Sequence, residues 1–592
     1  MQHRIARTMG AVALATAGLM VPIAAGTAGA QDTLTFSVGT TQDIDTLNVT
    51  AGFLVIDYEI WNLTLPTLTN KAAADFSIEP ALAESWTSSD DGLTWTYTLR
   101  EGLQWSDGEP LTADDIVYTI TRSVEEEWQN HISTTGNLTA TAPDERTVVV
   151  TSAVPDPKLP ILDMYIVPKH VYETISAEDL PNYPADDNIS GGPFRIVERR
   201  EGEFVRLEKN PNWYGDEPAM DELIFRIFEN PEAQYNALRA GDLDAVDEVP
   251  TQIFPSLVDG AEENITAIGG NQGGFSELAM NAGCEAGIGD GHVALKDQKV
   301  RQAINWAIDR DLLVDKVLNG LGTPGVSISP SANPAFDLRV SDDERYTYDP
   351  ERAATLLDEA GWTDADGNGV REKDGVDLRL RFFDRSVGDA SATTEFLTGW
   401  LNDVGIATEV QTYDEDTLTA IIGKGEFDLF TWGWVPFVDP DPMLSYLTSE
   451  QVTTDAEVVG YNDANWCNPE YDALYEQQKV ELDAAKRADL IQQALMVLYT
   501  DAPYAVMYKT DDLQAFRSDR WENFVRQPAE TGPVLFTNTS PAYLSLTPTD
   551  GAGGGDGSNL GLIIGAVAVV AVLGGGGLWL RGRRTKRDDD RE

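Results

Sequence analysis

The chain has 592 residues and carries 98 Asp and Glu against 42 Lys and Arg, a formal net charge of -56. A chain of this length divides its core among more than one lobe, and so negative a surface repels nucleic acid phosphates and argues against nucleic acid binding. Hydrophobic residues make up 42% of the chain and aromatic residues 9%, which is enough apolar surface to offset the ordering entropy of a folded protein.

The N-terminal segment has the three-part pattern of a secretory signal peptide. A basic start is followed by an uncharged apolar run over 9–25 and by the small-residue tripeptide Ala-Gly-Ala at 28–30. Such segments are removed on export. Residues 1–30 are therefore predicted to be a signal peptide, and the mature chain is predicted to begin near Gln31.

The C-terminal end predicts a membrane anchor. Residues 560–580 form an uncharged run of about 20 residues, enough to cross about 30 Å of hydrocarbon as a helix. A Gly-rich linker at 548–559 precedes this run and a basic tail at 581–592 follows it. Under the positive-inside rule the tail is cytoplasmic. The sequence thus predicts a protein held in the cytoplasmic membrane by a C-terminal transmembrane helix, with the rest of the chain exposed at the cell surface.

In the first half of the mature chain, strand patterns are mixed with helix patterns. Apolar residues alternate over 34–38 and again over 93–99, and the second run lies between the turn pairs Asp91-Gly92 and Asp107-Gly108, which predicts a hairpin. Thr112, with Asp115 three residues later, predicts a helix start of the capping-box type. Further strands are expected at 194–197, 204–207 and 223–228, and a further helix at 231–240.

From about residue 279 onward, longer helices alternate with strands. Apolar residues recur at helical spacing over 300–318, 351–360, 392–404 and 483–499. Strands are expected between them at 378–383, 407–412 and 428–432. This alternation predicts an α/β lobe.

The chain has two cysteines, Cys284 and Cys467. In an exported protein they can form a disulfide, and two free buried thiols are the alternative. No histidine or cysteine stands at ligand spacing to another, so neither a metal site nor a cofactor is predicted. Residues 364–369 resemble the front of a calcium loop, but position twelve is Gly375 instead of a bidentate carboxylate, which favours a tight turn. The GxSxG, P-loop and HExxH motifs are missing, so the sequence does not predict an enzyme. Residues 320–325 fit a GxGxxG pattern formally, but they follow a helix instead of a strand, which favours a glycine-rich loop.

A long block of the first half resembles a known family. The runs AESWTSSDDGLTWTYTLR at 83–100 and WSDGEPLTADD at 105–115 are similar to the signature of the extracellular solute-binding proteins of ABC importers, in family 5, which includes dipeptide and oligopeptide binders. Further matches follow in the family's order at 191–194, 210–214, 238–244, 280–281, 300–310, 360–362 and 428–442.

The resemblance implies an α/β fold of two lobes, like a periplasmic binding protein of type II in the large peptide-binder cluster. Lobe one would be discontinuous and consist of 31–278, including an extra subdomain, and a return segment at 508–547. Lobe two would be inserted at 279–507. Such proteins close on a ligand by hinge motion.

The resemblance also implies where a ligand binds. In peptide-binding relatives, an Asp three residues after a Gly-Trp pair holds the ligand's α-amino group. Here Phe437 stands at that position and Asp439 is the nearest carboxylate. If Asp439 reaches the cleft, an amine-bearing ligand is expected. If it does not, Trp432, Trp434 and Phe437 offer apolar faces to a sugar ring or a side chain, unless they pack between the lobes. Arg385 follows a strand that lines the cleft in relatives, and it is either a partner of a ligand carboxylate or an ordinary surface residue.

The function expected from the resemblance is that of a monomeric receptor, without enzymatic activity, that captures a peptide-like solute and delivers it to ABC permease and ATPase subunits. A receptor for an oligosaccharide or another non-peptide solute is one alternative. A second alternative is a ligand-sensing ectodomain. It would have to signal through a partner, because a tail of about a dozen residues is too short for an output domain.

Overall fold

The structure is a computed structural model that describes residues 33–551, except for 45, 53, 127, 129–137, 163, 186–188, 272, 386–389, 456–458 and 536–540. The chain divides into two compact units, Met1–Thr33 and Leu34–Glu592, and the elements below all belong to the second. The predicted signal peptide lies outside the described residues.

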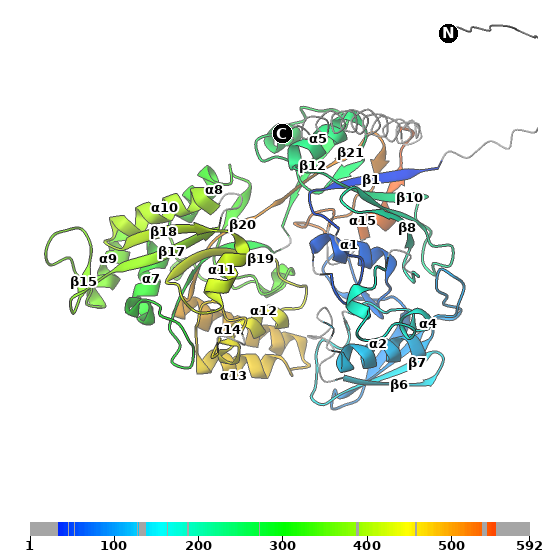
Figure 1. The fold of residues 1–592 in the computed structure, drawn as a ribbon, viewed down its shortest axis with the longest axis horizontal. Coiled ribbons are helices and arrows are strands. Elements are labelled where there is room, and N and C mark those ends of the chain that lie inside the picture. The colour runs from blue at the N-terminus through cyan, green and yellow to red at the C-terminus, as the bar shows by residue number, and fades with distance from the viewer. Residues whose placement is uncertain are drawn as a thin grey trace, which may run out of the picture. The chain divides into compact units, whose positions relative to one another are not determined.

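Lobe one is built on a seven-stranded sheet whose strands come from distant parts of the chain (Figure 1). The sheet has the strand order β12-β21-β11-β1-β10-β9-β8. Strand β1 runs parallel to β10 and β11, and the other neighbours are antiparallel. The strands are β1 (Thr35–Thr40), β8 (Phe194–Arg200), β9 (Phe204–Lys209), β10 (Glu222–Ile227), β11 (Ala245–Val246), β12 (Ile265–Gly270) and β21 (Asp512–Arg517).

Helices and a short strand pair complete this sheet layer. Residues of β1, β8, β9, β10 and α1 form one apolar core together with side chains from 516–546, so the end of the described chain is part of the first lobe. The additional elements are α1 (Val55–Thr64), α5 (Pro231–Ala240), α6 (Phe254–Val258), α15 (Pro541–Ser545), β22 (Trp521–Glu522) and β23 (Thr547–Pro548).

A subdomain of lobe one contains the predicted hairpin. Its four-stranded sheet has the order β4-β5-β7-β6, and α2 packs on the buried face through Ile116 and Ile120. The predicted capping box is confirmed, since Thr112 N–H donates to Asp115 Oδ2 at 2.9 Å. The elements are β2 (Thr69–Lys71), β3 (Ile78–Pro80), β4 (Ala83–Ser88), β5 (Thr94–Leu99), α2 (Ala113–Glu125), β6 (Leu138–Asp144), β7 (Thr147–Ser152), α4 (Lys169–Tyr172) and a 3-10 turn at Leu180–Asn182.

Lobe two is built on a six-stranded sheet of order β14-β20-β13-β19-β17-β18. Strand β17 runs parallel to both β18 and β19, so the carboxyl ends of these three strands lie at one edge of the sheet. The strands are β13 (Phe275–Met280), β14 (Gly322–Pro324), β17 (Arg379–Arg385), β18 (Ala407–Tyr413), β19 (Leu429–Trp434) and β20 (Tyr504–Thr510), and a small ladder joins β15 (Glu372–Lys373) to β16 (Val376–Asp377).

Helices cover both faces of this sheet. Successive residues of β17 point to opposite sides, so Phe382 packs with α7 to α10 while Phe383 packs with α11 to α14. The helices are α7 (Gln298–Ala307), α8 (Arg310–Lys316), α9 (Pro350–Glu359), α10 (Ala390–Asp403), α11 (Glu415–Ile422), α12 (Asp441–Tyr446), α13 (Pro469–Gln478) and α14 (Ala484–Asp501), with 3-10 turns at Val293–Lys296, Pro334–Phe336 and Ser449–Gln451.

The helix expected over 300–318 is two helices, α7 and α8. Ile308 has an extended backbone, and the side chain of Asp309 accepts a hydrogen bond from Leu312 N at 2.9 Å, which caps α8. Apolar spacing continues across the break and therefore hides it, while the cap is a local polar signal.

Two short segments connect the lobes. Strand β12 of lobe one is followed by β13 of lobe two, and β20 of lobe two is separated from β21 of lobe one by Asp511 alone. Gly270 and Asp512 are paired across β12 and β21, and the side chain of Asn271 donates to Thr510 O. The chain thus passes from the sheet of lobe one to that of lobe two between β12 and β13, and it returns at Asp511. Both crossings lie a few residues from the positions expected from the resemblance.

The predicted transmembrane helix requires a correction. Among the described residues, no helix combines the length and the apolar character that crossing a bilayer requires. Helix α14, for example, has 18 residues but carries Lys486, Arg487 and Asp489. Residues 560–580, the tail at 581–592 and most of the linker lie outside the described part. The described residues support the two-lobed α/β fold, and the predicted C-terminal membrane helix and the localisation that depends on it are withdrawn.

Candidate ligand-binding site

A cavity of about 170 Å³ lies in lobe two beside the ends of β17 and β19. Its lining includes Arg385 at the end of β17, Thr393 of α10, Trp432 of β19 and Tyr508 of β20. The edge where parallel strands end is the common ligand site of open α/β sheets, because loops and helix starts there leave space and free polar groups. The position of this cavity is thus that of a binding site.

Arg385 is the charged group of this cavity. Its guanidinium carbon lies 4.7 Å from the ring centre of Trp432, and Nη1 contacts Glu415 Oε1 at 3.1 Å. The stacking holds the flexible side chain in one place. Its Nε is buried and has no hydrogen-bond partner among the described residues. A carboxylate of a ligand would supply the acceptor that this donor needs.

A second, much smaller cavity of about 10 Å³ lies beside β13 and α12. Its walls include Glu277 of β13, Trp434 of β19, Tyr446 of α12 and, from the loop before α13, Tyr461 and Asp463. The side chain of Glu277 is fully buried, and its Oε1 accepts a hydrogen bond from Trp434 Nε1 at 2.9 Å. The cavity therefore combines aromatic rings with two carboxylates.

Both carboxylates of the small cavity hold protons more tightly than usual. Burial, reinforced by the charge of Asp463, raises the pKa of Glu277 well above its ordinary value, whereas Trp434 and the positive charge of Arg385 lower it in part. Burial also raises the pKa of Asp463 to about 6, against a hydrogen bond from the hydroxyl of Tyr504. A cation next to Glu277 and Asp463 would lower both pKa values, because it favours the charged carboxylates.

Asp439 does not line either cavity. Its two oxygens accept hydrogen bonds from Arg487 Nη1 and Nη2, both at 2.8 Å, and Oδ1 also accepts from Asp441 N at 2.9 Å. Burial raises the pKa of Asp439, but Arg487 outweighs burial and holds that pKa below its ordinary value. The carboxylate thus fastens the loop after β19 to α14.

The predicted aromatic residues are divided among three places. Trp432 lines the larger cavity under Arg385, and Trp434 lines the smaller one. Phe437 is 41% exposed, and its carbonyl accepts a hydrogen bond from Ala332 N at 2.8 Å. The structure thus brings Arg385 and Trp432 together, and it separates both from Phe437 and Asp439.

One ion pair joins the two lobes directly. Lys158, which follows β7 in the subdomain of lobe one, contacts Asp441 Oδ2 at 2.7 Å at the start of α12. Gln478 of α13 donates to the other oxygen of Asp441 at 2.8 Å. Burial lowers the pKa of Lys158, but the carboxylates of Asp441, Asp156 and Asp439 together outweigh burial, and the net shift is upward. The pair thus links the subdomain of lobe one to the start of α12 in lobe two.

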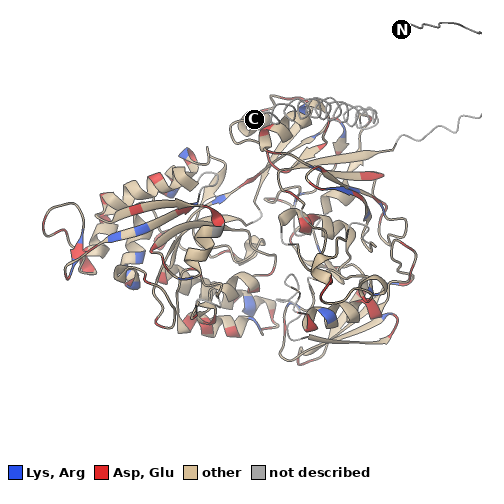
Figure 2. Ribbon diagram, in the orientation of Figure 1, with Lys and Arg blue, Asp and Glu red and all other residues tan. Residues whose placement is uncertain are grey.

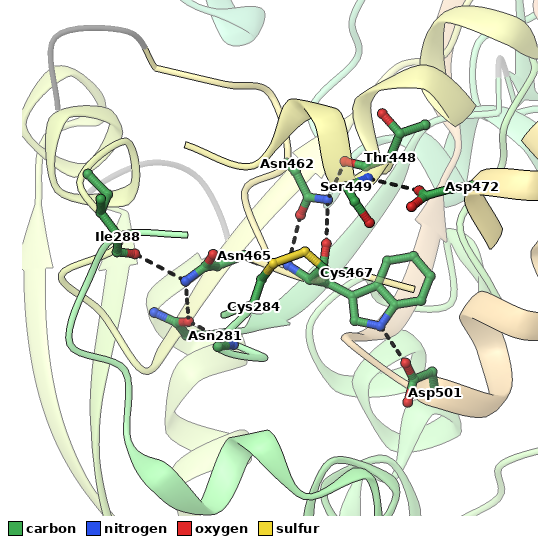
Figure 3. Close-up of a disulfide and its surroundings, with 12 residues drawn as sticks. Asn281, Cys284, Ile288, Thr448, Ser449, Asn462, Asn465, Cys467, Asp472 and Asp501 are labelled. Carbon is green, nitrogen blue, oxygen red and sulfur yellow. Dashed lines mark hydrogen bonds between the residues drawn. A yellow bond between two sulfur atoms is a disulfide. The ribbon is translucent and has the colours of Figure 1, made fainter. Parts of the chain in front are cut away.

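Cys284 and Cys467 form a disulfide in the structure, with 5.3 Å between their Cα atoms and a sequence separation of 183 (Figure 3). The same figure shows the side chain of Asn465, which donates to Asn281 Oδ1 at 3.1 Å and to Ile288 O at 3.2 Å. These links attach the loop before α13, which carries Asp463, to the end of β13.

The loop at 364–372 places three carboxylates, those of Asp364, Asp366 and Glu372, within 4.8 Å of one another. Asp364 accepts hydrogen bonds from the backbone N–H groups of Gly367, Asn368 and Gly369. The side chain of Asp364 thus closes the tight turn of its own loop.

Sequence reasoning missed Glu277 and Asp463. The signal for Glu277 was available, since it is the charged residue of the otherwise uncharged strand sequence FSELAM. Burying a carboxylate in a strand of the core is costly, so such a residue is expected to have either a stabilising partner or a functional role. Asp463 had no such signal, because acids are common in this chain.

Acidic residues occur on elements of both lobes (Figure 2). The acidic residues are thus spread over both lobes. This spread of acidic residues does not mark either lobe as the surface that binds a cationic partner.

Comparisons with known proteins identify the fold and the family. Residues 77–455, more than half of the chain, match the family model described as bacterial extracellular solute-binding proteins, family 5 Middle. The chain is 25% identical over 470 residues to the oligopeptide-binding protein AppA of Bacillus subtilis, covering 76% of this chain and 81% of AppA. It is 24% identical over 465 residues to the dipeptide-binding protein of Escherichia coli, covering 74% of this chain and 82% of that protein.

A solved structure with the same fold is NikA from Brucella suis in complex with Fe(III)-EDTA. It has a TM-score of 0.72 and 23% identity, and the match covers 87% of this chain and all of NikA (100%). The curated relatives named above are binding proteins. The chain belongs to the bacterial extracellular solute-binding proteins of family 5.

Proposed function

We propose that the protein is the receptor of an ABC importer that captures a peptide and delivers it to the permease subunits. The observation that carries the proposal is the cavity at the ends of β17 and β19, where Arg385 stacks on Trp432. Membership of family 5 and the relatives named for oligopeptide and dipeptide binding support it.

In this proposal Arg385 receives the carboxylate of the peptide. The ring of Trp432 fixes the guanidinium, so little side-chain freedom is lost when the ligand binds. The unpartnered Nε is buried, and a bidentate ion pair in such a place is stronger than one on the surface. The main effect of Arg385 is therefore expected on affinity for ligands with a free carboxylate.

Closure of the lobes would follow from ligand binding. A ligand shifts an equilibrium between open and closed forms by its difference in affinity for the two. Contacts between the lobes such as Lys158–Asp441 would then favour the closed arrangement, and the permease would recognise that arrangement.

The test is a calorimetric titration with tri- to pentapeptides and with the same peptides amidated at the C-terminus. We expect tighter binding of the free acids. Arg385→Gln should weaken their binding more than tenfold and leave the amidated peptides unchanged. The matched control is Arg379→Gln, at the exposed start of the same strand.

Equal affinity of wild type and Arg385→Gln for free-acid peptides would remove Arg385 from this role. If neutral oligosaccharides bind and peptides do not, the proposal of a peptide receptor is wrong and the alternative of a sugar receptor replaces it.

A further inference from the structure

The small cavity beside β13 contains a carboxylate oxygen without a partner. Glu277 is 0% exposed, and its Oε2 has no hydrogen-bond partner in the described part of the chain. Its other oxygen is held by Trp434, so the carboxylate is fixed in orientation. A second carboxylate, Asp463, stands in the wall of the same cavity.

A structural role alone does not account for this arrangement. Burying a carboxylate is costly unless it is paired, and two neighbouring carboxylates add repulsion. In the same lobe, the buried Asp439 has its own arginine, Arg487, at 2.8 Å. Arg385 influences Glu277 only through space, and its guanidinium contacts Glu415 instead. Glu277 is thus a buried carboxylate that no cation of the described residues contacts, although pairing with a cation would offset the cost of its burial.

The remaining walls suit a cation. Tyr446 stacks on Tyr461 with 4.8 Å between ring centres, and Trp434 lies 6.0 Å from Tyr446. The faces of such rings attract positive charge. Tyr461 is 57% exposed, so the aromatic wall reaches from the buried carboxylate to the surface.

The size of the cavity limits which cation enters. About 10 Å³ is the space that one water-sized centre requires. A primary ammonium group has that size, whereas a guanidinium or a quaternary ammonium group is larger. The ammonium of a solute is therefore the group that matches both the charge and the volume.

We propose that this cavity is the subsite for a primary ammonium group of the transported solute, neutralised by Glu277 and Asp463 and enclosed by Trp434 and Tyr446. The inference rests on the proposed receptor function and narrows its substrates to amine-bearing ones. Phe437 stands where relatives carry an amino-binding Asp, so the subsite supplies the amino anchor from β13 and the loop before α13 instead. With Arg385 on the neighbouring strand ends, the two subsites together take a solute with an ammonium at one end and a carboxylate at the other.

The first experiment tests the subsite without any peptide. The thermal unfolding midpoint of the full-length protein is measured with methylammonium chloride, with tetramethylammonium chloride and with sodium chloride at equal ionic strength. We expect a saturable rise in Tm of about 2 °C that only methylammonium gives, because a ligand that binds the folded form alone stabilises it.

The variants for this experiment are Glu277→Gln and Asp463→Asn. The first keeps the acceptor for Trp434 Nε1 and removes only the charge, and both should abolish the response to methylammonium. Glu59→Gln is the matched control, since Glu59 is also a buried glutamate but lies in α1 of lobe one, and it should respond like wild type. If methylammonium and tetramethylammonium act alike on wild type, or if both cavity variants respond like wild type, the inference is wrong.

The second experiment connects the subsite to transport substrates. A pool of tri- to pentapeptides is treated with acetic anhydride, which acetylates the amino groups and leaves the carboxylates. Mass spectrometry then measures how much of the treated and untreated pools the protein retains. We expect at least tenfold lower retention of the treated pool, and loss of this discrimination in Glu277→Gln.

The two experiments separate failure of the inference from failure of the proposed function. Equal retention of both pools would overturn the ammonium subsite and leave the peptide receptor standing. Retention of neither pool, with a specific response to methylammonium, would overturn the peptide receptor and support the subsite.

Discussion

At the residue scale, two buried acids of lobe two show how a partner decides the role of a carboxylate. Asp439 is neutralised by Arg487, so it holds a loop to a helix. Glu277 has a tryptophan N–H on one oxygen and, among the described residues, nothing on the other, so it is left for a ligand. The spacing from the Gly-Trp pair leads to Phe437, and Asp439 is only the nearest carboxylate. Spacing along the sequence contains no information on partners such as Arg487, which lies far along the chain.

The Asp439–Arg487 pair gives a stability prediction. We expect Arg487→Met to lower the free energy of unfolding by about 3 kcal/mol, because it leaves a buried carboxylate without its cation. Urea denaturation of wild type, of the single variant and of Arg487→Met combined with Asp439→Leu measures the effect. The double variant should recover most of the loss. A single variant as stable as wild type would contradict the structural role.

Glu59 gives a pH prediction. Burial raises its pKa to about 8, opposed by a hydrogen bond from Tyr543 of α15 and reinforced by Asp247. In the unfolded chain its pKa is about 4.5. Its contribution to stability is thus fully present below about pH 4.5 and is lost as the pH rises toward 8, where the folded form also ionises. We expect Glu59→Gln to flatten the fall of unfolding free energy over this range, measured by denaturation at several pH values. Parallel curves for the two proteins would contradict the prediction.

At the element scale, patterns within short stretches of sequence predicted secondary structure well, whereas such patterns did not predict contacts between residues far apart in sequence. The hairpin of the subdomain and the Thr112 cap are each encoded in one short continuous stretch of sequence, and the structure has both. The break between α7 and α8 was missed because apolar spacing runs through it. Arg385 and Trp432 were reached through the family resemblance. The Glu277 cavity was not reached, since Asp463 approaches β13 only through contacts that span 180 or more residues of chain.

The disulfide gives a prediction for the loop before α13. We expect Cys284→Ser with Cys467→Ser to lower the free energy of unfolding by about 3 to 5 kcal/mol, because the cross-link restricts a long stretch of the unfolded chain. Hydrogen exchange at Ala464, whose neighbour Asp463 lines the small cavity, should become faster than at residues of β1, which serve as the internal control. Unchanged exchange at Ala464 would show that the asparagine hydrogen bonds alone hold the loop.

At the scale of the whole molecule, the Lys158–Asp441 ion pair links the two lobes, so we expect it to stabilise the closed form. The pair is largely buried, so it contributes more than an exposed ion pair does. The net shift of the Lys158 pKa is upward, which means that the lysine is charged at neutral pH and remains an attractive partner.

Lys158→Met tests this contact. We expect the open form to gain population, and affinity for a captured solute to fall about fivefold or more, because the binding-competent form becomes rarer. Small-angle X-ray scattering measures the population and calorimetry the affinity. Lys169→Met is the control, since Lys169 also belongs to lobe one but makes only a partly exposed contact with Asp114 at 3.9 Å. If both variants scatter and bind like wild type, the pair has no part in closure.

The way the chain crosses between the lobes has a consequence for protein engineering. Gly270 and Asp512 are partners in one antiparallel ladder, so the second lobe is in effect an insertion at the tip of a β-hairpin of the first. A two-residue turn between these positions would remove the insertion and restore an ordinary hairpin. The excised piece would keep both cysteines of its disulfide and the strands β13, β17 and β19, which line the two cavities. It would serve as a single-lobe reagent in which ligand contacts are measured without domain closure.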